Sequence, residues 1–375
     1  MAKFIIKDKE FSNDEKNEYK KLRQLSSLFN ISDLSLQILF NRGYKNEKEI
    51  LHLLNGELKD VHPAEFLTDC EKFTEIVKEA ILSKKKIICY SDYDIDGVCS
   101  ASALCLGVKN AGGIIDFYTN NRFEEGYGIT KNGVDDLLAK FPDTNLIITT
   151  DNGIVGFEGI NHAVKRGIDV IVTDHHEQGD EIPKDALAVI NPKRKDCDYP
   201  FDGLCGAGVV FKLLISLYYE MNLDLEYIYD LLDIIALATV GDLVPLVDEN
   251  RIIVKEGLKK ISYGKRLAFK KLREGLGVTK VDEETFGYTY GPLINAIGRI
   301  NGTPGNAIRL FITDDESEMD LIVKELVDLN NERKELTKSQ EKLALSLLHE
   351  KKELPNVIVL KHKDFHEGVV GLIAG

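Results

Sequence analysis

One stretch decides the fold class of this chain: Lys86-Ile87-Ile88-Cys89-Tyr90-Ser91-Asp92-Tyr93-Asp94-Ile95-Asp96-Gly97. Its first five residues form a short run rich in β-branched and aromatic side chains, which predicts a buried β-strand. The acidic residues and the glycine that follow indicate a turn from strand into helix. The stretch therefore predicts the start of a strand–helix unit.

The same pattern continues for about a hundred residues. Four further strand-like runs follow, separated by segments with helical spacing at 97–110, 129–139 and 156–166. The runs are Ile114–Tyr118, Asn145–Thr150, Ile168–Thr173 and Leu187–Asn191. Strands that alternate with helices predict an α/β fold with a doubly wound parallel sheet. In such folds, ligands bind outside the carboxyl ends of the strands.

The flanking segments predict the domain organisation. Residues 1–74 are expected to form a helical N-terminal segment, and residues 75–315 the catalytic domain. Residues 316–353 carry apolar side chains at helical spacing around a strongly polar middle, which predicts a long connecting helix. Residues 354–375 are expected to start a second domain with a strand at Asn356–Leu360. We expect the sequence to be the first part of a longer protein.

Composition narrows the class of protein. Apolar residues make up 43% of the 375 residues and charged residues 29%, as in ordinary globular proteins. No apolar run is long enough to span a bilayer, and the apolar stretch at the N-terminus is too short for a signal peptide, so we expect a cytoplasmic protein without a membrane segment. The six cysteines form no C-x-x-C pair, which indicates reduced thiols. The net charge of −14 excludes a globally basic nucleic-acid binder but not a locally basic groove.

Acidic or histidine motifs follow four of the apolar segments. Three of them come directly after predicted strands, and the fourth ends an apolar helical run. The motifs are Asp92-Tyr93-Asp94-Ile95-Asp96, Asp151-Asn152-Gly153, Asp174-His175-His176 and Asp242. A lone aspartate after a strand is usually a helix N-cap, and a lone histidine pair is usually a surface or core feature. The recurrence of such motifs at strand ends favours a shared site instead.

Carboxylates packed this closely repel one another unless cations hold them. Oxygen ligands with a minority of imidazole suit Mn²⁺ or Mg²⁺ better than a structural zinc site. A pair of ions about 4 Å apart can clamp the attacking and leaving oxygens of a phosphoryl displacement. The candidate ligands are Asp94, Asp96, Asp151, His175 and Asp242.

These motifs resemble the DHH phosphoesterase family in their order and spacing. Further segments are similar to the RecJ-type single-strand exonucleases of that family, so that the resemblance covers residues 85–375. They are Asn121–Gly128, Asn191–Lys193, Tyr199–Phe201, Gly206–Leu213, Thr239–Leu246, Gly291–Arg299 and His366–Gly375, the last resembling the opening of the DHH-associated domain.

The resemblance implies a 5′→3′ exonuclease that hydrolyses single-stranded DNA to nucleotides with two Mn²⁺ or Mg²⁺ ions, in DNA repair and recombination. A single-strand-binding protein and a helicase are candidate partners. Asp94, Asp96, Asp151, His175 and Asp242 would be metal ligands, with Asp151 bridging. Asp92 would be a sixth ligand or would support the others.

The resemblance also implies roles for residues that contact the substrate. Asp174 would orient the histidines, and His176 would contact the scissile phosphate. Arg122, Arg299 and Asn295 would hold the DNA, although either arginine could instead be an ordinary surface or salt-bridged residue. The chain departs from the family at Leu293, where an arginine is usual, so one phosphate contact is expected to be missing or supplied elsewhere.

Three alternatives remain open. A DHH hydrolase of short oligonucleotides, cyclic dinucleotides or pyrophosphate would share the same metal site, but the similarity beyond residue 190 favours the exonuclease. A DNA-binding scaffold without metals should lack some of the ligands, and all of them are present. A nucleotide-binding α/β domain without hydrolysis should carry G-x-G-x-x-G or a P-loop lysine motif, and the sequence has neither.

Overall fold

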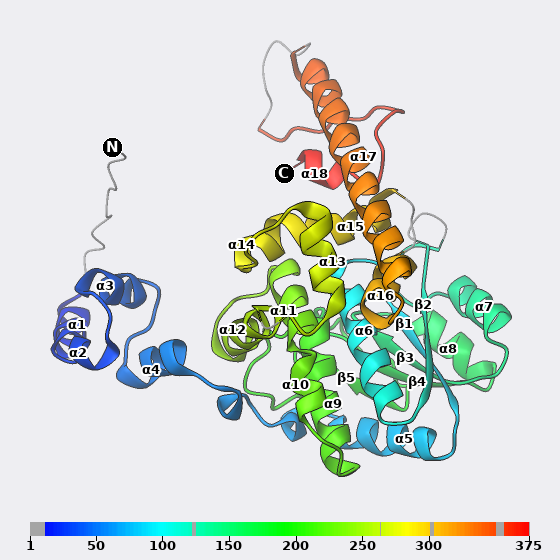
Figure 1. Cartoon of the computed structure of the whole chain (residues 1–375), viewed down its shortest axis with the longest axis horizontal. Coiled ribbons are helices and arrows are strands. Elements are labelled where there is room, and N and C mark those ends of the chain that lie inside the picture. Colours follow the sequence, from blue (N-terminus) through cyan, green and yellow to red (C-terminus); the bar gives the residue numbers. More distant parts are fainter. Residues whose placement is uncertain (1–11, 122–124, 263, 301–303, 350–355, 375) are drawn as a thin grey trace. The chain divides into compact units, whose positions relative to one another are not determined.

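The computed structural model describes residues 12–121, 125–262, 264–300, 304–349 and 356–374 (Figure 1). The chain divides into two compact units. The first comprises Met1–Val61 with Val247–Ile252, and the second comprises His62–Leu246 with Ile253–Gly375. The first unit is helical in its described residues, and the second contains the sheet.

The first unit is a small helical bundle of α1 (Asn13–Gln24), α2 (Ser26–Phe29), α3 (Asp33–Asn41) and α4 (Glu47–Asn55). Serine and asparagine caps start three of these helices, because a side-chain oxygen satisfies a backbone N–H that has no partner within the helix. The apolar faces share one core, formed by Leu22, Phe29, Leu36, Phe40 and Ile50. The helical character predicted for the N-terminal segment is confirmed.

The second unit is built on a five-stranded, entirely parallel sheet in the order β2-β1-β3-β4-β5. The strands are β1 (Lys86–Ser91), β2 (Ile114–Thr119), β3 (Thr144–Thr150), β4 (Asp169–Thr173) and β5 (Ala188–Ile190). Ser91 pairs with Thr150, which pairs with Thr173. The last residues of three neighbouring strands therefore lie in line, so that Asp92, Asp151 and Asp174 follow at the same edge.

Helices cover both faces of this sheet (Figure 1). α7 (Lys131–Lys140) and α8 (Phe157–Lys165) pack against each other over one face, where Ile88 and Tyr90 of β1 point into their core. α5 (Cys70–Leu82), α6 (Ile95–Asn110) and α9 (Gly206–Glu220) cover the other face. The predicted doubly wound α/β fold is confirmed, because side chains alternate between the two faces and both faces are apolar.

Helices make up most of the remaining chain. They are η1 (Leu58–Asp60), η2 (Ala64–Phe66), α10 (Glu226–Asp230), α11 (Leu232–Gly241), α12 (Asp248–Ser262), α13 (Leu267–Leu276), α14 (Glu283–Thr285), the π-helical turn η3 (Phe286–Tyr290), α15 (Gly291–Ile300), α16 (Gly305–Ile312), α17 (Glu316–His349) and α18 (Val370–Ala374). The long helix predicted from residue 316 is α17, which packs on α13, α15 and α16. Residues 350–353 of that prediction lie outside the described residues.

The strand predicted at Asn356–Leu360 is wrong. These residues form bends and irregular chain, and Val357 and Val359 are about three-quarters exposed. A strand needs a neighbour to satisfy its backbone groups, and none of the described strands pairs with this segment. In the described part of the chain, no helix combines the length and apolar character that a membrane crossing requires.

Candidate metal centre

The candidate site lies where the strand order reverses. From β1 the chain passes to β2 on one side of the sheet and then returns to β3 on the other side. The loops that leave the carboxyl ends of β1 and β3 therefore diverge, and they frame a crevice of the kind that binds ligands in open α/β sheets. Asp92 follows β1 and Asp151 follows β3 at this position.

The loop after β1 presents three carboxylates and also starts α6. Asp94 is the N-cap of α6, and its Oδ1 accepts hydrogen bonds from the backbone N–H groups of Asp96 and Gly97. Asp92 is buried, and its Oδ1 has no hydrogen-bonding partner among the described residues. The N-cap and the metal-ligand interpretations are thus compatible, because capping uses only one oxygen of Asp94.

The start of α9 anchors Asp96, a contact that sequence reasoning missed. The fully buried carboxylate accepts hydrogen bonds from the backbone N–H groups of Gly206 at 2.5 Å and Ala207 at 2.8 Å. A Cβ at Gly206 would lie 2.8 Å from the Cβ of Asp151. The run of small residues at 206–208 is the sequence feature that indicates this close approach.

Asp151 occupies the centre of the cluster. Its backbone has φ +61, in the left-handed region that non-glycine residues rarely adopt. The side chain is buried, and neither carboxylate oxygen has a hydrogen-bonding partner among the described residues. Strain together with an unsatisfied buried carboxylate is typical of a functional position.

His175 and Asp242 complete the cluster from distant parts of the chain. The Nε2 atom of His175 lies 3.1 Å from Asp151 Oδ1, 3.5 Å from Asp96 Oδ2 and 3.6 Å from Asp242 Oδ2. Asp242 is the C-cap of α11. Both ring nitrogens of His175 are buried without a hydrogen-bonding partner in the described structure. The five predicted principal ligands thus converge, and Asp92 joins them.

These side chains form three overlapping groups whose ligand atoms lie within 4.8 Å of one another. The groups are Asp92–Asp94–Asp151, Asp96–His175–Asp242 and Asp151–His175–His176. Asp151 and His175 each belong to two of them, and the bridging role of Asp151 stays a prediction. The donors are carboxylate oxygens with a minority of imidazole, which fits Mn²⁺ or Mg²⁺, and the orphaned oxygens of Asp92 and Asp151 fit a cation better than a hydrogen-bonded core.

Burial, and then the charge of neighbouring carboxylates, raises the pKa of Asp92, Asp94 and Asp151 above the ordinary range. The same causes raise the pKa of Asp242 to about 8. Burial lowers the pKa of His175. Without a cation, the cluster therefore favours protonated carboxyls and a neutral imidazole, and a divalent cation would displace those protons.

Asp174 organises the loop that carries both histidines. Its Oδ1 lies 2.8 Å from His176 Nδ1 and accepts from the backbone N–H groups of His175 and His176, while its Oδ2 accepts from Ile154 N. Burial opposes ionisation, but these hydrogen bonds outweigh it and lower the pKa of Asp174. The hydrogen bond to Asp174 raises the pKa of His176. Of the two histidine rings, that of His176 hydrogen-bonds the carboxylate in the described structure.

Comparison with known proteins identifies the family. Residues 86–239 match the DHH family, N-terminal domain. The chain is 33% identical over 356 residues to the single-stranded-DNA-specific exonuclease RecJ of Bacillus subtilis, covering 94% of this chain and 44% of that protein. For the Escherichia coli protein of the same name, the identity is 35% over 351 residues, covering 89% of this chain and 59% of that protein.

A crystal structure of exonuclease RecJ bound to manganese superposes with a TM-score of 0.74 and 31% identity, covering 82% of this chain and 76% of that chain. This chain belongs to the RecJ group of the DHH family. It spans about half the length of the curated relatives it matches.

The residues that the RecJ resemblance assigns to substrate contact do not share one environment in the structure. Arg299, half-buried on α15, donates from Nη1 to the carbonyl oxygen of Gly368 at 3.2 Å. Asn295, one turn earlier, uses its Oδ1 to accept from the backbone N–H of Ile95 at 2.8 Å. Leu293 is fully buried, so its side chain belongs to the core. Arg122 lies outside the described residues.

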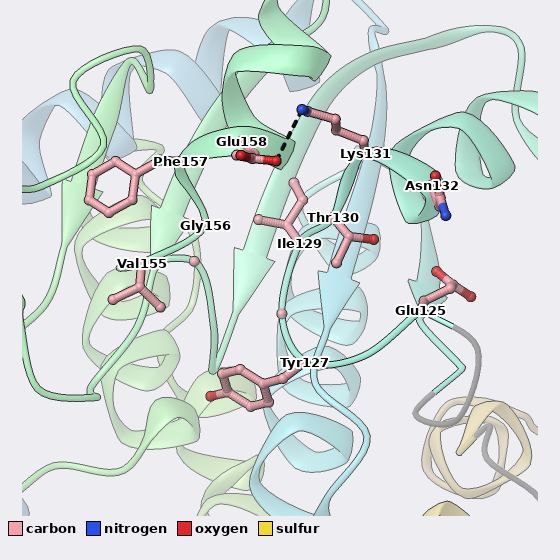
Figure 2. Close-up of a pocket in the computed structure, with 12 residues that line it drawn as sticks. Glu125, Tyr127, Ile129, Thr130, Lys131, Asn132, Val155, Gly156, Phe157 and Glu158 are labelled. Atoms are coloured by element: carbon pink, nitrogen blue, oxygen red, sulfur yellow. Dashed lines mark ion pairs between the residues drawn. The ribbon is translucent and has the colours of Figure 1, made fainter.

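A pocket of about 420 Å³ opens beside the metal centre (Figure 2). Figure 2 shows Tyr127 at the end toward which the strands point, and the ion pair of Lys131 with Glu158, 3.0 Å apart, at the opposite end. The Tyr127 hydroxyl lies 3.2 Å from His176 Nε2. Tyr127 therefore connects the pocket to the DHH motif, which sequence reasoning did not foresee.

Proposed function

We propose that this chain carries the catalytic part of a metal-dependent 5′→3′ exonuclease that hydrolyses single-stranded DNA, in DNA repair and recombination. One observation carries the proposal: the carboxylates and the imidazole of four separate motifs converge within ligand distance at one edge of the sheet. The similarity to RecJ exonucleases supports the choice of substrate.

Asp94, Asp96, Asp151, His175 and Asp242 would hold two Mn²⁺ or Mg²⁺ ions, with Asp92 as a further ligand or a supporting residue. The bound ions would polarise the phosphodiester and neutralise charge that develops on its oxygens. The protein would hold its ligands in place through the α9 backbone at Asp96 and the α6 cap at Asp94. Divalent cations fit this site because buried carboxylate oxygens of Asp92 and Asp151 have no hydrogen-bonding partner among the described residues.

His176 would act on the substrate directly. Because the Asp174 carboxylate accepts at Nδ1, that nitrogen carries a proton, and Nε2, which lies 3.2 Å from the Tyr127 hydroxyl, is the atom that would turn to the substrate. The raised pKa of His176 favours the imidazolium, which donates from Nε2 to a non-bridging phosphate oxygen. Asp174 would orient this ring, and Asp151 would serve both ions.

Arg122, Arg299 and Asn295 are proposed to hold the DNA strand, and the pocket beside Tyr127 offers space for a nucleotide next to His176. We further propose residues 75–315 as the catalytic domain, 316–353 as the connecting helix and 354–375 as part of a further domain. A single-strand-binding protein and a helicase are proposed partners. A cytoplasmic location is proposed as well, in keeping with the expectation from the sequence.

The deciding experiment compares labelled single strands, labelled duplexes and dinucleotides with Mn²⁺, Mg²⁺ or a chelator. We expect mononucleotides to be released from the 5′ end of single strands, with either ion and not with chelator. Preference for dinucleotides would favour the short-oligonucleotide hydrolase instead. Equal release in chelator would contradict the metal centre.

A further inference from the structure

A strongly basic segment stands out against the acidic chain. Between residues 255 and 273 the sequence carries eight lysines and arginines and a single acidic residue, Glu256, although the whole chain has a net charge of −14. The segment covers the end of α12 and most of α13. None of these residues takes part in the metal centre, so their charge requires another explanation.

Most of these cations form ion pairs. Five form ion pairs with acids on α10, α11, α12 or α17, at 2.7 to 3.3 Å: Lys259, Lys260, Lys265, Arg266 and Lys271. Lys255 also interacts with another group, so it is not a free cation. Lys270 and Arg273 differ from the rest, because neither has an acidic partner in the described parts of the chain.

Lys270 and Arg273 line the same pocket. It measures about 490 Å³ and lies between the α12–α13 connection, α13 and the segment that follows α13. Arg266 adds a third cation to the wall, Glu274 adds one carboxylate, and Phe269 provides an apolar surface. Residues 266, 269, 270 and 273 share one face of α13, because they follow helical spacing. Helical geometry therefore places Lys270 and Arg273 on the same face of α13.

A buried hydrogen-bond donor without an acceptor occurs on one residue that lines this pocket, and a second occurs on a residue packed against its wall. The Nε of Arg273 is buried and has no partner in the described structure, and Nη2 makes only a 3.4 Å contact with the carbonyl oxygen of Thr279. The hydroxyl of Tyr290, whose ring packs on Phe269 with centroids 6.2 Å apart, is also buried without a partner there. Unsatisfied buried donors are rare in proteins, and the one on Arg273 favours an anionic acceptor in this pocket.

We propose that this pocket is a phosphate-binding site, separate from the metal centre. A guanidinium fork next to an ammonium group matches the tetrahedral oxygens of a phosphate, and the surplus cations compensate its charge. The phosphate would belong to the backbone of a single strand or to a free phosphate or nucleotide. In the first case, the site would grip the strand away from the bond that is cleaved. The proposal does not require that the metal centre hydrolyse DNA.

The test uses metal-free protein in chelator, where the metal centre cannot hold a phosphate through an ion. Inorganic phosphate, dTMP and oligo(dT) are titrated at constant ionic strength, with melting temperature and fluorescence anisotropy as readouts. The variants are K270E, at an exposed position of α13, and R273K, which keeps the charge but removes the fork. We expect each to weaken binding about tenfold, as for loss of a charge-assisted contact.

The matched controls are K259A and K184A, which remove lysines paired with Glu256 and Glu181, each three residues away. They should leave phosphate binding unchanged. If the site binds the phosphate of a nucleic acid, only oligo(dT) should bind more weakly to the variants. The slope of log affinity against log salt should then fall in magnitude by about one in K270E. If the site binds a free anion, phosphate or dTMP should bind more weakly as well. Equal binding by wild type and K270E for all three probes would overturn the proposal, as would an equal loss in the controls.

Discussion

Single residues at the metal centre serve two purposes at once. Asp94 caps α6 with one oxygen and offers the other to the cluster, so the turn that starts the helix also aims the ligands. Asn295 acts on the same turn from 200 residues away, because its Oδ1 accepts from Ile95 N. The close packing of Gly298 beside the backbone of Tyr93 brings α15 near enough for this contact.

Replacing Asn295 tests whether it positions the metal ligands or holds DNA. N295L removes the acceptor for a buried N–H, which costs about 1–3 kcal/mol, and should weaken Mn²⁺ binding about tenfold. N295D keeps the acceptor and should bind Mn²⁺ at least as well as wild type. The measurements are calorimetric titration with Mn²⁺ and anisotropy with oligo(dT) in chelator.

N46L is the control, because Asn46 likewise accepts from a helix N–H, that of Glu49. It should lower stability without changing Mn²⁺ affinity. A direct DNA contact would give the opposite result for Asn295: weaker oligo(dT) binding in N295L with unaltered Mn²⁺ binding.

Asp151 is the residue on which the two-ion arrangement depends most. D151A removes the carboxylate that is shared by two of the three groups. We expect Mn²⁺-dependent nucleotide release to fall by at least about a hundredfold, with the fold retained in circular dichroism. Activity within a few fold of wild type would show that the bridging assignment is wrong.

At the scale of elements, α9 completes a site that the strands begin. The strands bring Asp92, Asp151 and Asp174 to one edge, and α9 then points its first N–H groups at Asp96. A helix N-terminus stabilises a carboxylate through its unsatisfied N–H groups and its dipole. These N–H groups stabilise the buried Asp96 carboxylate even though other carboxyl groups surround it.

The contact between α9 and Asp151 leaves no space for a side chain at Gly206. In G206A, the new Cβ would lie 2.8 Å from Asp151 Cβ, so the backbone has to shift. The strain should cost about 1–3 kcal/mol, more than the roughly 0.5–1 kcal/mol that alanine gains over glycine in a helix. Thermal unfolding and Mn²⁺ titration should both show losses.

G179A provides the matched control, because a Cβ there has nothing within 4 Å. It should leave stability and Mn²⁺ affinity close to those of wild type. Wild-type Mn²⁺ affinity in G206A would mean that α9 does not position Asp96 and Asp151.

At the scale of the whole molecule, the metal centre concentrates negative charge in a protein that is already acidic. Four of its carboxyls have a raised pKa, and for Asp242 the value is about 8. In the folded, metal-free protein these four carboxyls therefore bind more protons than they do in the unfolded chain between about pH 4 and pH 8. Their contribution to stability is present at low pH and is lost as the pH rises through this range.

The metal-free protein should consequently melt at a lower temperature at pH 8 than at pH 5.5. The raised pKa of His176 acts in the same direction, and the lowered pKa of His175 opposes it. Mn²⁺ should raise the melting temperature more at pH 8, because the carboxyls give up protons to bind it. D242N should reduce the pH dependence in chelator. A metal-free melting temperature that rises with pH would contradict these pKa directions.

The sequence alone predicted the strands of the sheet and the edge at which the ligands meet. The run at 86–90 became β1, and the one at 187–191 became β5, which is one residue shorter at each end. Such runs are recognisable because side-chain periodicity is local, and parallel strands place their carboxyl ends together. The strand prediction at Asn356–Leu360 is wrong because an apolar run forms a strand only where a partner strand is available.

Only the tertiary structure decided which groups face one another across long separations in sequence. The N–H groups of Gly206 and Ala207 at Asp96, the Asn295 contact with Ile95 and the Tyr127 contact with His176 depend on how helices and loops pack on the sheet. The tertiary structure also decides that Lys270 and Arg273 have no acidic partner among the described residues, because most of the neighbouring ion pairs join elements that are distant in sequence. Periodicity carries no information about such contacts, since they are set by packing between elements.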